Sequence, residues 1–309
     1  GTTAGLIGVY TAGGGKLTNN AKITGDKGYG IISNGTEVEN TGNITLTNPL
    51  TSSKPSVGIL TQAGNKITNT GTVTVGNNSV GIFGKEIVQK GIVTVGNGGT
   101  GLYSEGGNVT LDSTSKINTG SNKAVGVFTK GTGQTITANA GSTMTIGDSS
   151  FGFLNEGKGN TINSNVANQT LRNDGTYIYS SDKSGTVNNN TTLTSTGSYN
   201  YGLYSAGTVT NNADINFGTG LGNVGIYSTY GGRATNLAGR NITVGASYKD
   251  PTDPLKDRYA VGMAAGFNGD GNPAKAYTGT VVNEGTINVN GQYSIGMYGT
   301  EAGTKVYNG

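Results

Sequence analysis

A short glycine-centred motif recurs along the whole chain and constrains its fold more than any other feature. The motif reads apolar residue, Gly, apolar residue, aromatic residue or Leu, and usually Ser or Thr, as in Tyr201-Gly202-Leu203-Tyr204-Ser205. Its central position occurs at Gly8, Gly30, Gly58, Gly81, Gly101, Gly126, Gly152, Tyr177, Gly202, Gly225, Gly262 and Gly296. Successive copies lie 20 to 37 residues apart. A repeat of that length with strand-like content is typical of a solenoid.

The composition is unusual for a globular core but fits an ordered repeat. The 309 residues include 57 Gly, and only 32% are hydrophobic, a balance that also occurs in disordered chains. The hydrophobic residues here are mostly β-branched and stand at fixed offsets from the motif, which indicates order. Gly, Thr and Asn are poor helix formers, so the pattern favours strands over helices.

Each repeat contains three short strand-like pieces, of which the glycine motif is the first. The second reads apolar residue, Thr or Asn, then Asn, as in Val209-Thr210-Asn211, and the third begins six residues later at Ile215. Apolar residues two apart, such as Ile215 and Phe217, mark a strand with one buried face. The sequence therefore predicts an all-β fold, a single-stranded right-handed parallel β-helix of about twelve three-strand coils. Residues 1–309 would form one continuous β-helix segment.

Asparagine recurs two residues after the apolar position of the second strand. In stacked coils these side chains would lie above one another, so each amide could bond to its neighbours in a ladder at one corner. We interpret the ladder as structural. Its predicted members are Asn19, Asn40, Asn69, Asn189, Asn211, Asn236 and Asn283.

Two long insertions, at about 246–259 and 266–277, bracket the strand from Val261 to Ala265. Loops on a rigid scaffold often carry recognition residues, and Tyr and Arg are enriched in binding hot spots. The alternative is that both insertions are passive surface loops. The candidate partner-binding residues in them are Tyr248, Arg258, Tyr259, Phe267 and Tyr277.

A largely aromatic row is predicted beside the glycines. If both neighbours of the central Gly point inward, the next residue points outward, and that position holds Tyr103, Tyr204 and Tyr227 in three of the repeats. An exposed apolar ridge of this kind usually contacts a partner. Two alternatives remain: the rings fold into the bore, or the ridge mediates self-association.

Several chemistries are excluded by residues that the chain lacks. With no His and no Cys, it cannot build Ser-His-Asp or Cys-His nucleophile systems, or Cys- or His-based zinc or haem sites, and we predict no cofactor. The formal charge is only +3 and the basic residues are scattered, so nucleic acid is not an expected partner. The sequence has no apolar run long enough to span a bilayer.

Carboxylate chemistry is the remaining enzymatic alternative. Asp250 and Asp253 could serve a polysaccharide lyase or hydrolase on a β-helix, although Asp250, Asp253 and Asp257 alternate with basic residues, which also describes a charged, solvated loop. The segment Asp270-Gly271-Asn272 resembles part of a calcium loop but lacks the surrounding acidic ligands.

The repeats resemble those of a known family. The segments Ser79-Val80-Gly81-Ile82-Phe83 and Asn283-Glu284-Gly285-Thr286-Ile287-Asn288-Val289-Asn290-Gly291 look like passenger repeats of the large, monomeric fusobacterial type V autotransporter adhesins, in the style of their arginine-inhibitable or galactose-binding members. The resemblance covers essentially the whole chain. Tyr177 at a glycine position and the two insertions depart from the plain pattern.

The resemblance implies a fragment of a long, surface-exposed passenger, normally followed by an outer-membrane β-barrel that would supply its only membrane contact. It implies a location at the cell surface and attachment to protein or glycan receptors on other bacteria or host cells. We therefore expect a monomeric, non-enzymatic adhesin segment that acts as rigid spacer and binding surface.

Overall fold

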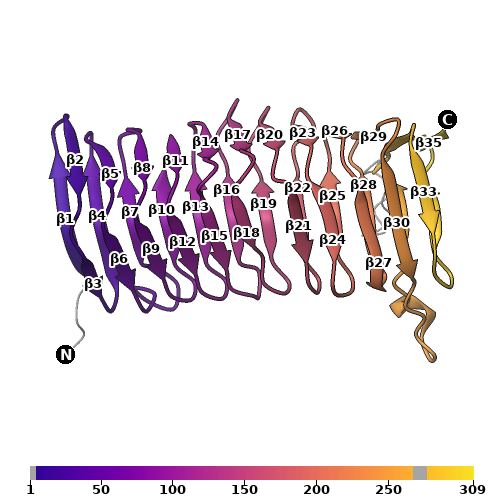
Figure 1. Ribbon diagram of the computed structural model, residues 1–309, viewed down its shortest axis with the longest axis horizontal. Coiled ribbons are helices and arrows are strands. Elements are labelled where there is room, and N and C mark those ends of the chain that lie inside the picture. The colour runs from indigo at the N-terminus through magenta and orange to yellow at the C-terminus, as the bar shows by residue number, and fades with distance from the viewer. Residues whose placement is uncertain (1–4, 267–276) are drawn as a thin grey trace. The chain divides into compact units, whose positions relative to one another are not determined.

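The computed structural model describes residues 5–266 and 277–309, and it confirms the predicted all-β, right-handed parallel β-helix of about twelve coils. Within each of two units of the chain, the strands of a coil lie in successive sheets, and each strand pairs in parallel with its equivalent in the next coil of that unit, as in Ile82↔Leu102 and Leu102↔Val127. The chain divides into two units, Gly1–Glu156 (unit 1) and Gly157–Gly309 (unit 2). Figure 1 shows the stacked coils of each unit.

The described residues of unit 1 form three parallel sheets. The first sheet contains β1 (Leu6–Ala12), β4 (Gly28–Asn34), β7 (Val57–Thr61), β10 (Val80–Gly84), β13 (Thr100–Ser104), β16 (Val125–Thr129) and β19 (Phe151–Asn155). The second contains β2 (Lys16–Asn19), β5 (Glu37–Asn40), β8 (Ile67–Asn69), β11 (Ile87–Gln89), β14 (Val109–Leu111) and β17 (Thr135–Ala138). The third contains β3 (Ile23–Gly25), β6 (Asn43–Leu46), β9 (Thr72–Val75), β12 (Ile92–Val95), β15 (Lys116–Thr119) and β18 (Thr143–Thr145).

Unit 2 repeats the arrangement. Its first sheet contains β22 (Thr176–Ser180), β25 (Tyr201–Ser205), β28 (Val224–Ser228), β31 (Val261–Ala265) and β34 (Ile295–Gly299). Its second contains β20 (Thr161–Ser164), β23 (Thr186–Asn189), β26 (Thr208–Asn211), β29 (Arg233–Asn236), β32 (Thr280–Asn283) and β35 (Lys305–Asn308). Its third contains β21 (Asn168–Leu171), β24 (Thr192–Ser195), β27 (Ile215–Leu221), β30 (Asn241–Ala246) and β33 (Thr286–Val289).

Helix is almost absent from the part of the chain that the structure describes. The 3-10 helix η1 (Pro254–Lys256) comprises 3 residues and lies in the insertion after β30. No helix within residues 5–266 and 277–309 has the length and apolar character needed to cross a membrane.

The central glycines are required because neighbouring coils approach closely at that position. A β-carbon on Gly81 would lie 2.6 Å from the carbonyl oxygen of Gly101 and 2.7 Å from Cγ1 of Val93 in the third sheet. On Gly225 it would lie 2.6 Å from the carbonyl oxygen of Gly262. Carbon atoms do not tolerate such separations, so a side chain at this position would force the coils apart.

Tyr177 is the exception to the glycine pattern, and it is completely buried. Its hydroxyl lies 2.6 Å from Oγ of Ser164, which in turn lies 2.6 Å from Oγ1 of Thr191. Ser164 ends β20 at the position that Asn occupies in the ladder of later coils. The larger ring is therefore accompanied by a smaller ladder residue that gives its hydroxyl a partner.

The core consists of one apolar residue after each central glycine and of apolar residues from the other two sheets. Leu203, Val209 and Ile215 are at most 1% exposed, as the strand pattern predicted. The assumption that the residue before the glycine also points inward was wrong for Tyr201, Val224 and Val261. The ring of Tyr201 packs edge-on against Tyr204 and Tyr227 on the outer face, with centroids 5.9 and 6.2 Å away.

The asparagine ladder is confirmed in both units. In unit 1, Nδ2 of Asn19 donates to Oδ1 of Asn40 (2.7 Å), and the chain of bonds continues through Asn69 to Gln89. Leu111 follows Gln89 in register, and Nε2 of Gln89 has no hydrogen-bond partner. The ladder there ends because Leu111 offers no acceptor.

In unit 2 the ladder runs through five consecutive coils. Each Nδ2 donates to the next Oδ1 over 2.8 to 2.9 Å. The same Nδ2 of Asn211 also donates to the carbonyl of Ala213, 2.7 Å away, at the following turn. Buried amides are thus paired both between coils and within a coil, which removes the cost of burying them. The members are Asn189, Asn211, Asn236, Asn283 and Asn308.

Substitution of a central glycine tests this packing. We expect Gly225→Ala to lower the free energy of unfolding by about 1–3 kcal/mol, because the new methyl group must displace the Gly262 carbonyl or the Ile242 side chain. Gly218→Ala is the matched control, since a β-carbon there meets only Cγ2 of Thr243 at 3.5 Å. Urea unfolding monitored by circular dichroism measures both variants. Equal stability of the two would contradict the proposed role of the close approach.

Candidate functional site

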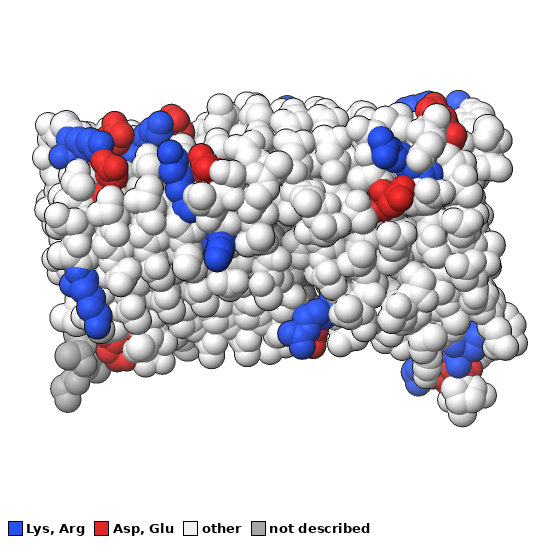
Figure 2. Space-filling view, viewed as in Figure 1, with Lys and Arg blue, Asp and Glu red and all other residues white. Residues whose placement is uncertain are grey.

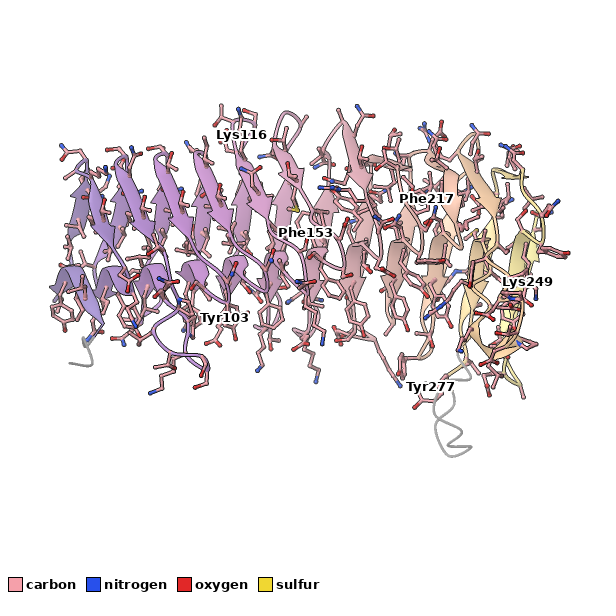
Figure 3. The ribbon with its side chains drawn as sticks, turned by 90° about the horizontal axis from the view of Figure 1, so that it is seen from below. Tyr103, Lys116, Phe153, Phe217, Lys249 and Tyr277 are labelled. Atoms are coloured by element: carbon pink, nitrogen blue, oxygen red, sulfur yellow. The ribbon has the colours of Figure 1, made fainter. Side chains whose placement is uncertain are left out.

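The predicted aromatic row lies on the outer face of the first sheet in both units. In unit 2 the rings of Tyr204 and Tyr227 stack with centroids 4.8 Å apart and an interplanar angle of 1°. In unit 1 Tyr103 lies between Phe83 and Phe128, with centroids 4.6 and 4.7 Å away. The rings cover one another and are half-buried, and Figure 3 shows Tyr103 outside the coil and Phe217 inside it. The alternative that these rings fold into the bore is therefore wrong.

The aromatic row is interrupted by an Ala in the last coils of unit 2. At the aromatic position β28 carries Tyr227, β31 carries Ala264 and β34 carries Tyr298. At the position before the glycine, Tyr201 replaces the smaller residues found in most other coils. Tyr201, Tyr227 and Ile295 pack against a small apolar cluster on the outer face, formed by Val224, Val261 and Ala264.

A groove lies between this cluster and the insertion after β30. It has a volume of about 580 Å³, which falls within the range of small-ligand sites. Strand residues form its floor, and the end of the insertion forms its wall. We call it the tyrosine groove, and it is lined by Tyr201, Gly222, Val224, Tyr227, Asp257, Arg258, Tyr259, Val261, Ala264, Ile295 and Tyr298.

The insertion is held closed at its base by an antiparallel bridge. The backbone N–H of Tyr248 donates to the carbonyl of Arg258 (2.8 Å), and the N–H of Arg258 donates to the carbonyl of Tyr248 (2.9 Å). The ammonium group of Lys249 contacts the Asp257 carboxylate and donates to the Tyr259 hydroxyl at 3.0 Å. It also lies 4.9 Å from the centroid of the Tyr259 ring. These contacts fix the wall of the groove, and Figure 2 shows acidic and basic side chains together at this loop.

The three carboxylates of the insertion are bound within the loop itself. Asp250 accepts from the backbone N–H of Thr252 and of Asp253, each at 2.9 Å. Asp253 caps η1 by accepting from the N–H of Leu255 at 3.0 Å. Hydrogen bonds from Thr252 lower the pKa of Asp250, and the hydrogen bond from Lys249 lowers that of Asp257. The arrangement is that of side chains that shape a loop.

Arg258 differs from the other charged groups of the insertion. Within the described residues, its guanidinium forms no ion pair, whereas Lys249 pairs with Asp257 and Lys256 with Asp253. Arg258 is exposed, and its positive charge acts to lower the pKa of Tyr201, opposing the larger effect of burial, which raises that pKa. Arg258 therefore lines the groove beside Tyr201 and Tyr227, and its guanidinium is not paired with a carboxylate of the described residues.

The structure brings Arg258, Tyr259 and Tyr227 of the predicted site residues together. Tyr204 supports Tyr227 from the adjacent coil, and Tyr248 lines a neighbouring hollow on the other side of Arg258. Tyr103 belongs to unit 1, where its hydroxyl donates to Glu105 at 2.7 Å.

Of the predicted site residues that the structure describes, Tyr103, Tyr204, Tyr248 and Tyr277 do not line the groove. Tyr277 is only 5% exposed and packs edge-on against Tyr230, so it supports the fold instead of offering a surface to a partner. Phe267 lies outside the described residues, as does the segment Asp270-Gly271-Asn272 that resembles a calcium loop.

Tyr201 and Tyr298 complete the groove but were not among the predicted site residues. Tyr201 could have been found from the sequence because a Tyr stands there in place of the Val or Thr that usually precedes the glycine. The contribution of the insertion to the same groove could not have been found from the sequence, since it depends on where the loop lies in the folded chain.

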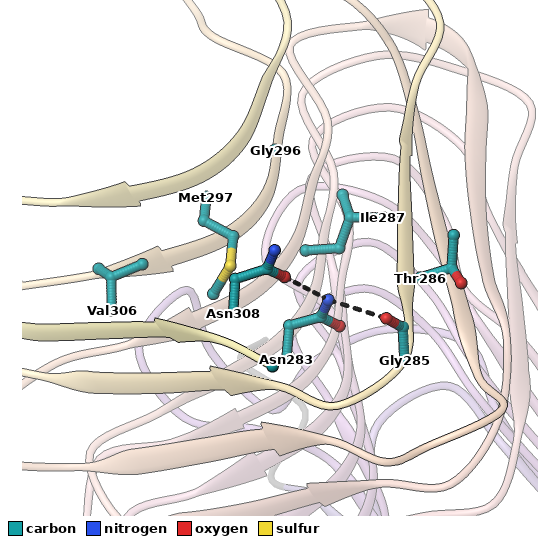
Figure 4. A pocket seen from close by; sticks show the side chains of 9 residues that line it. Asn283, Gly285, Thr286, Ile287, Gly296, Met297, Val306 and Asn308 are labelled. Atoms are coloured by element: carbon teal, nitrogen blue, oxygen red, sulfur yellow. Dashed lines mark hydrogen bonds between the residues drawn. The ribbon is translucent and has the colours of Figure 1, made fainter.

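A second hollow belongs to the core and not to the surface (Figure 4). It lies against Ile287, Met297 and Val306, whose register partners Ile242, Met263 and Val281 in the preceding coil are fully buried. Asn283 and Asn308, which also line it, are joined by the ladder bond of 2.8 Å. The hollow is the inner face of the last described coil.

Among residues 5–266 and 277–309, no group of three or more His, Cys, Asp or Glu side chains lies close enough together to hold a metal ion.

One comparison with known proteins finds a family. Residues 83–309 match the model of the BigA third pectate lyase-like domain, which covers more than half of the chain. The match supports a β-helical domain of a bacterial surface protein. No curated protein and no solved structure gives a significant match.

The insertion after β30 should lose stability as the pH falls. The lowered pKa values of Asp250 and Asp257 mean that their stabilisation is complete above the ordinary carboxyl pKa, about 4, and is lost as the pH falls through the lowered values. We expect the NMR signals of the Tyr259 ring to stay constant from pH 7 to about pH 4 and to shift below it.

In Asp257→Asn, the NMR signals of the Tyr259 ring at pH 7 should match those of the wild type at low pH, because the ion pair between Lys249 and Asp257 is lost. Glu284→Gln, at an exposed acid of unit 2, is the control and should change nothing. A Tyr259 spectrum that is identical in wild type and Asp257→Asn would show that the pair does not hold the loop.

Proposed function

The chain belongs to the family of the BigA third pectate lyase-like domain, and on that premise we propose that it is a non-enzymatic adhesin segment of a bacterial surface protein. The tyrosine groove is its contact surface. The β-helix acts as the rigid support that presents this groove. The observation that carries the proposal is the convergence of Tyr227, Tyr259 and Arg258 on one outer surface.

The chemistry of the groove supports recognition of a partner. Tyr and Arg are the residue types most often found in binding hot spots, and Tyr offers a flat apolar face together with a hydroxyl. The exposed fraction of Tyr259 is 43% and that of Tyr298 is 47%. The rings are held by stacking and by Lys249, so binding would order few new side chains and lose little entropy.

The resemblance of the repeats suggests a finer version of the proposal. The segment would be part of an autotransporter passenger, displayed outside the outer membrane as a monomer and attaching to protein or glycan receptors on other bacteria or host cells. The ring row in each unit supports this picture, because its stacked rings are only half-buried and keep part of their surface open to a partner.

An enzymatic function is the alternative, since the family is described as pectate lyase-like. Its candidate groups are Asp250 and Asp253. Both use their carboxylate oxygens for backbone N–H groups of the insertion, which supports a structural role. Arg258 lines the groove and could contact an acidic polymer. We assign it a role in binding the polymer and not in cleaving it.

Attachment of cells tests the adhesin proposal. We expect beads coated with the chain to capture bacterial or host cells, and Tyr259→Ala with Arg258→Ala to weaken capture by about tenfold or more, as for hot-spot truncations. Tyr307→Ala is the matched control, because its ring is 50% exposed but does not line the groove. Capture that is unchanged in the double variant would remove the groove from the proposal, and no capture by the wild-type chain would remove the proposal itself.

A polysaccharide assay separates the two functions. The chain is incubated with polygalacturonate and other acidic polysaccharides, with and without calcium, and new reducing or unsaturated ends are measured. We expect no release above that of a heat-denatured sample. Release that is abolished by Asp250→Asn and Asp253→Asn would establish the enzymatic alternative.

A further inference from the structure

We propose that the tyrosine groove binds a saccharide residue that carries a carboxylate, with Arg258 pairing with the carboxylate and the tyrosine rings contacting the sugar face. This inference rests on the proposed adhesin function, because it names the ligand class of the same surface. It requires a flat apolar floor, a cation without a partner and an opening that suits a small polar ring.

The floor of the groove is apolar and closely packed. Val224, Val261 and Ala264 are at most 6% exposed, and Tyr201 and Tyr227 pack around them. The hydroxyl of Tyr227 donates to the carbonyl of Gly266 at 2.7 Å, which fixes the ring edge. The C–H faces of a sugar ring pack well on such surfaces, while its hydroxyls remain available to solvent and to Tyr hydroxyls.

The wall supplies the charge. Asp257 and Arg258 are the charged residues that line the groove, and Asp257 is neutralised by Lys249. The Arg258 guanidinium has no ion-pair partner among the described residues, so it is the charged group of the groove lining that can still pair with a ligand. A guanidinium forms two parallel hydrogen bonds with a carboxylate, which gives both strength and orientation.

The position of Arg258 is set before any ligand arrives. Its backbone is clamped by the bridge to Tyr248, and the Lys249–Asp257 pair holds the adjacent residues of the wall. The cation can therefore reach a ligand on the floor without refolding the loop, which lowers the entropic cost of binding.

A saccharide fits this surface better than a peptide does. Extended peptides commonly bind by adding a strand to a free sheet edge. Here β31, at the floor of the groove, pairs with β28 on one side and β34 on the other, so its backbone groups are already used. The groove thus offers ring faces and one cation, and an acidic peptide is the competing occupant that the experiment must exclude.

Calorimetric titration of the chain with paired ligands tests the inference. The ligands are a glucuronic-acid-terminated oligosaccharide, the same oligosaccharide with its carboxyl group as a methyl ester, and an acidic peptide. We expect binding of the acid to be about tenfold or more tighter than that of the ester, because esterification removes the charged partner of Arg258. Arg258→Ala should remove that preference, and Arg258→Lys should restore it in part.

Lys256→Ala provides the matched control, since it removes a positive charge from the same insertion without altering the groove lining. Tyr259→Ala should weaken binding of the acid and of the ester alike. This result would separate the contribution of ring contact from that of charge pairing. Each variant is compared with wild type by its circular dichroism spectrum and unfolding midpoint.

Equal affinity for acid and ester, equal losses in Arg258→Ala and Lys256→Ala, or binding of the peptide alone would each overturn the inference. A chain that captures cells yet shows one of these results keeps the adhesin function and loses only its assigned ligand. Failure of capture, in contrast, is a result of the cell experiment and concerns the adhesin function itself.

Discussion

The close approach of adjacent coils at the central glycines is the constraint on which the rest of the structure depends. The carbonyl oxygen of Gly101 lies where a side chain on Gly81 would begin, and the same geometry recurs at Gly202 and Gly225. Because the glycine faces the bore without filling it, the next residue also enters the core. The residue after that lies outside, and in most coils it is a ring or a Leu. The aromatic row is therefore a consequence of the glycine packing.

The groove arises where the repeat is broken. A Tyr precedes the glycine in β25, an Ala replaces the ring in β31, and the chain leaves the coil for a long insertion before β31 begins. Each change is local, but the stacking of coils brings all three to one surface. Regular coils supply the rigid floor, and the irregular ones supply the shape and charge that a partner could recognise.

The sequence was sufficient for the architecture because the fold repeats the same local solutions. The Asn ladder, the six-residue offset to the third strand and the glycine positions each reflect a contact that recurs from coil to coil along much of the chain. The site was harder to predict. Arg258 and Tyr227 were identifiable as residue types, yet their meeting depends on the path of the insertion, and the burial of Tyr277 against Tyr230 depends on packing that no repeat pattern records. The orientation of Tyr201 was missed because strict alternation fails at the glycine bend.

The ladder also bears on how chains of this type can change in length. In unit 2, Asn211, Asn236 and Asn283 each donate to one neighbour and accept from the other, so the coils that carry them present the same two faces. Duplication of one coil would therefore create no unmatched surface and would lengthen the array by about 4.8 Å. Where Leu111 follows Gln89 in register, two adjacent coils do not match, and this costs stability because the Gln89 amide is left without a partner. Gene duplication would thus be expected to proceed more freely through the Asn-bearing coils.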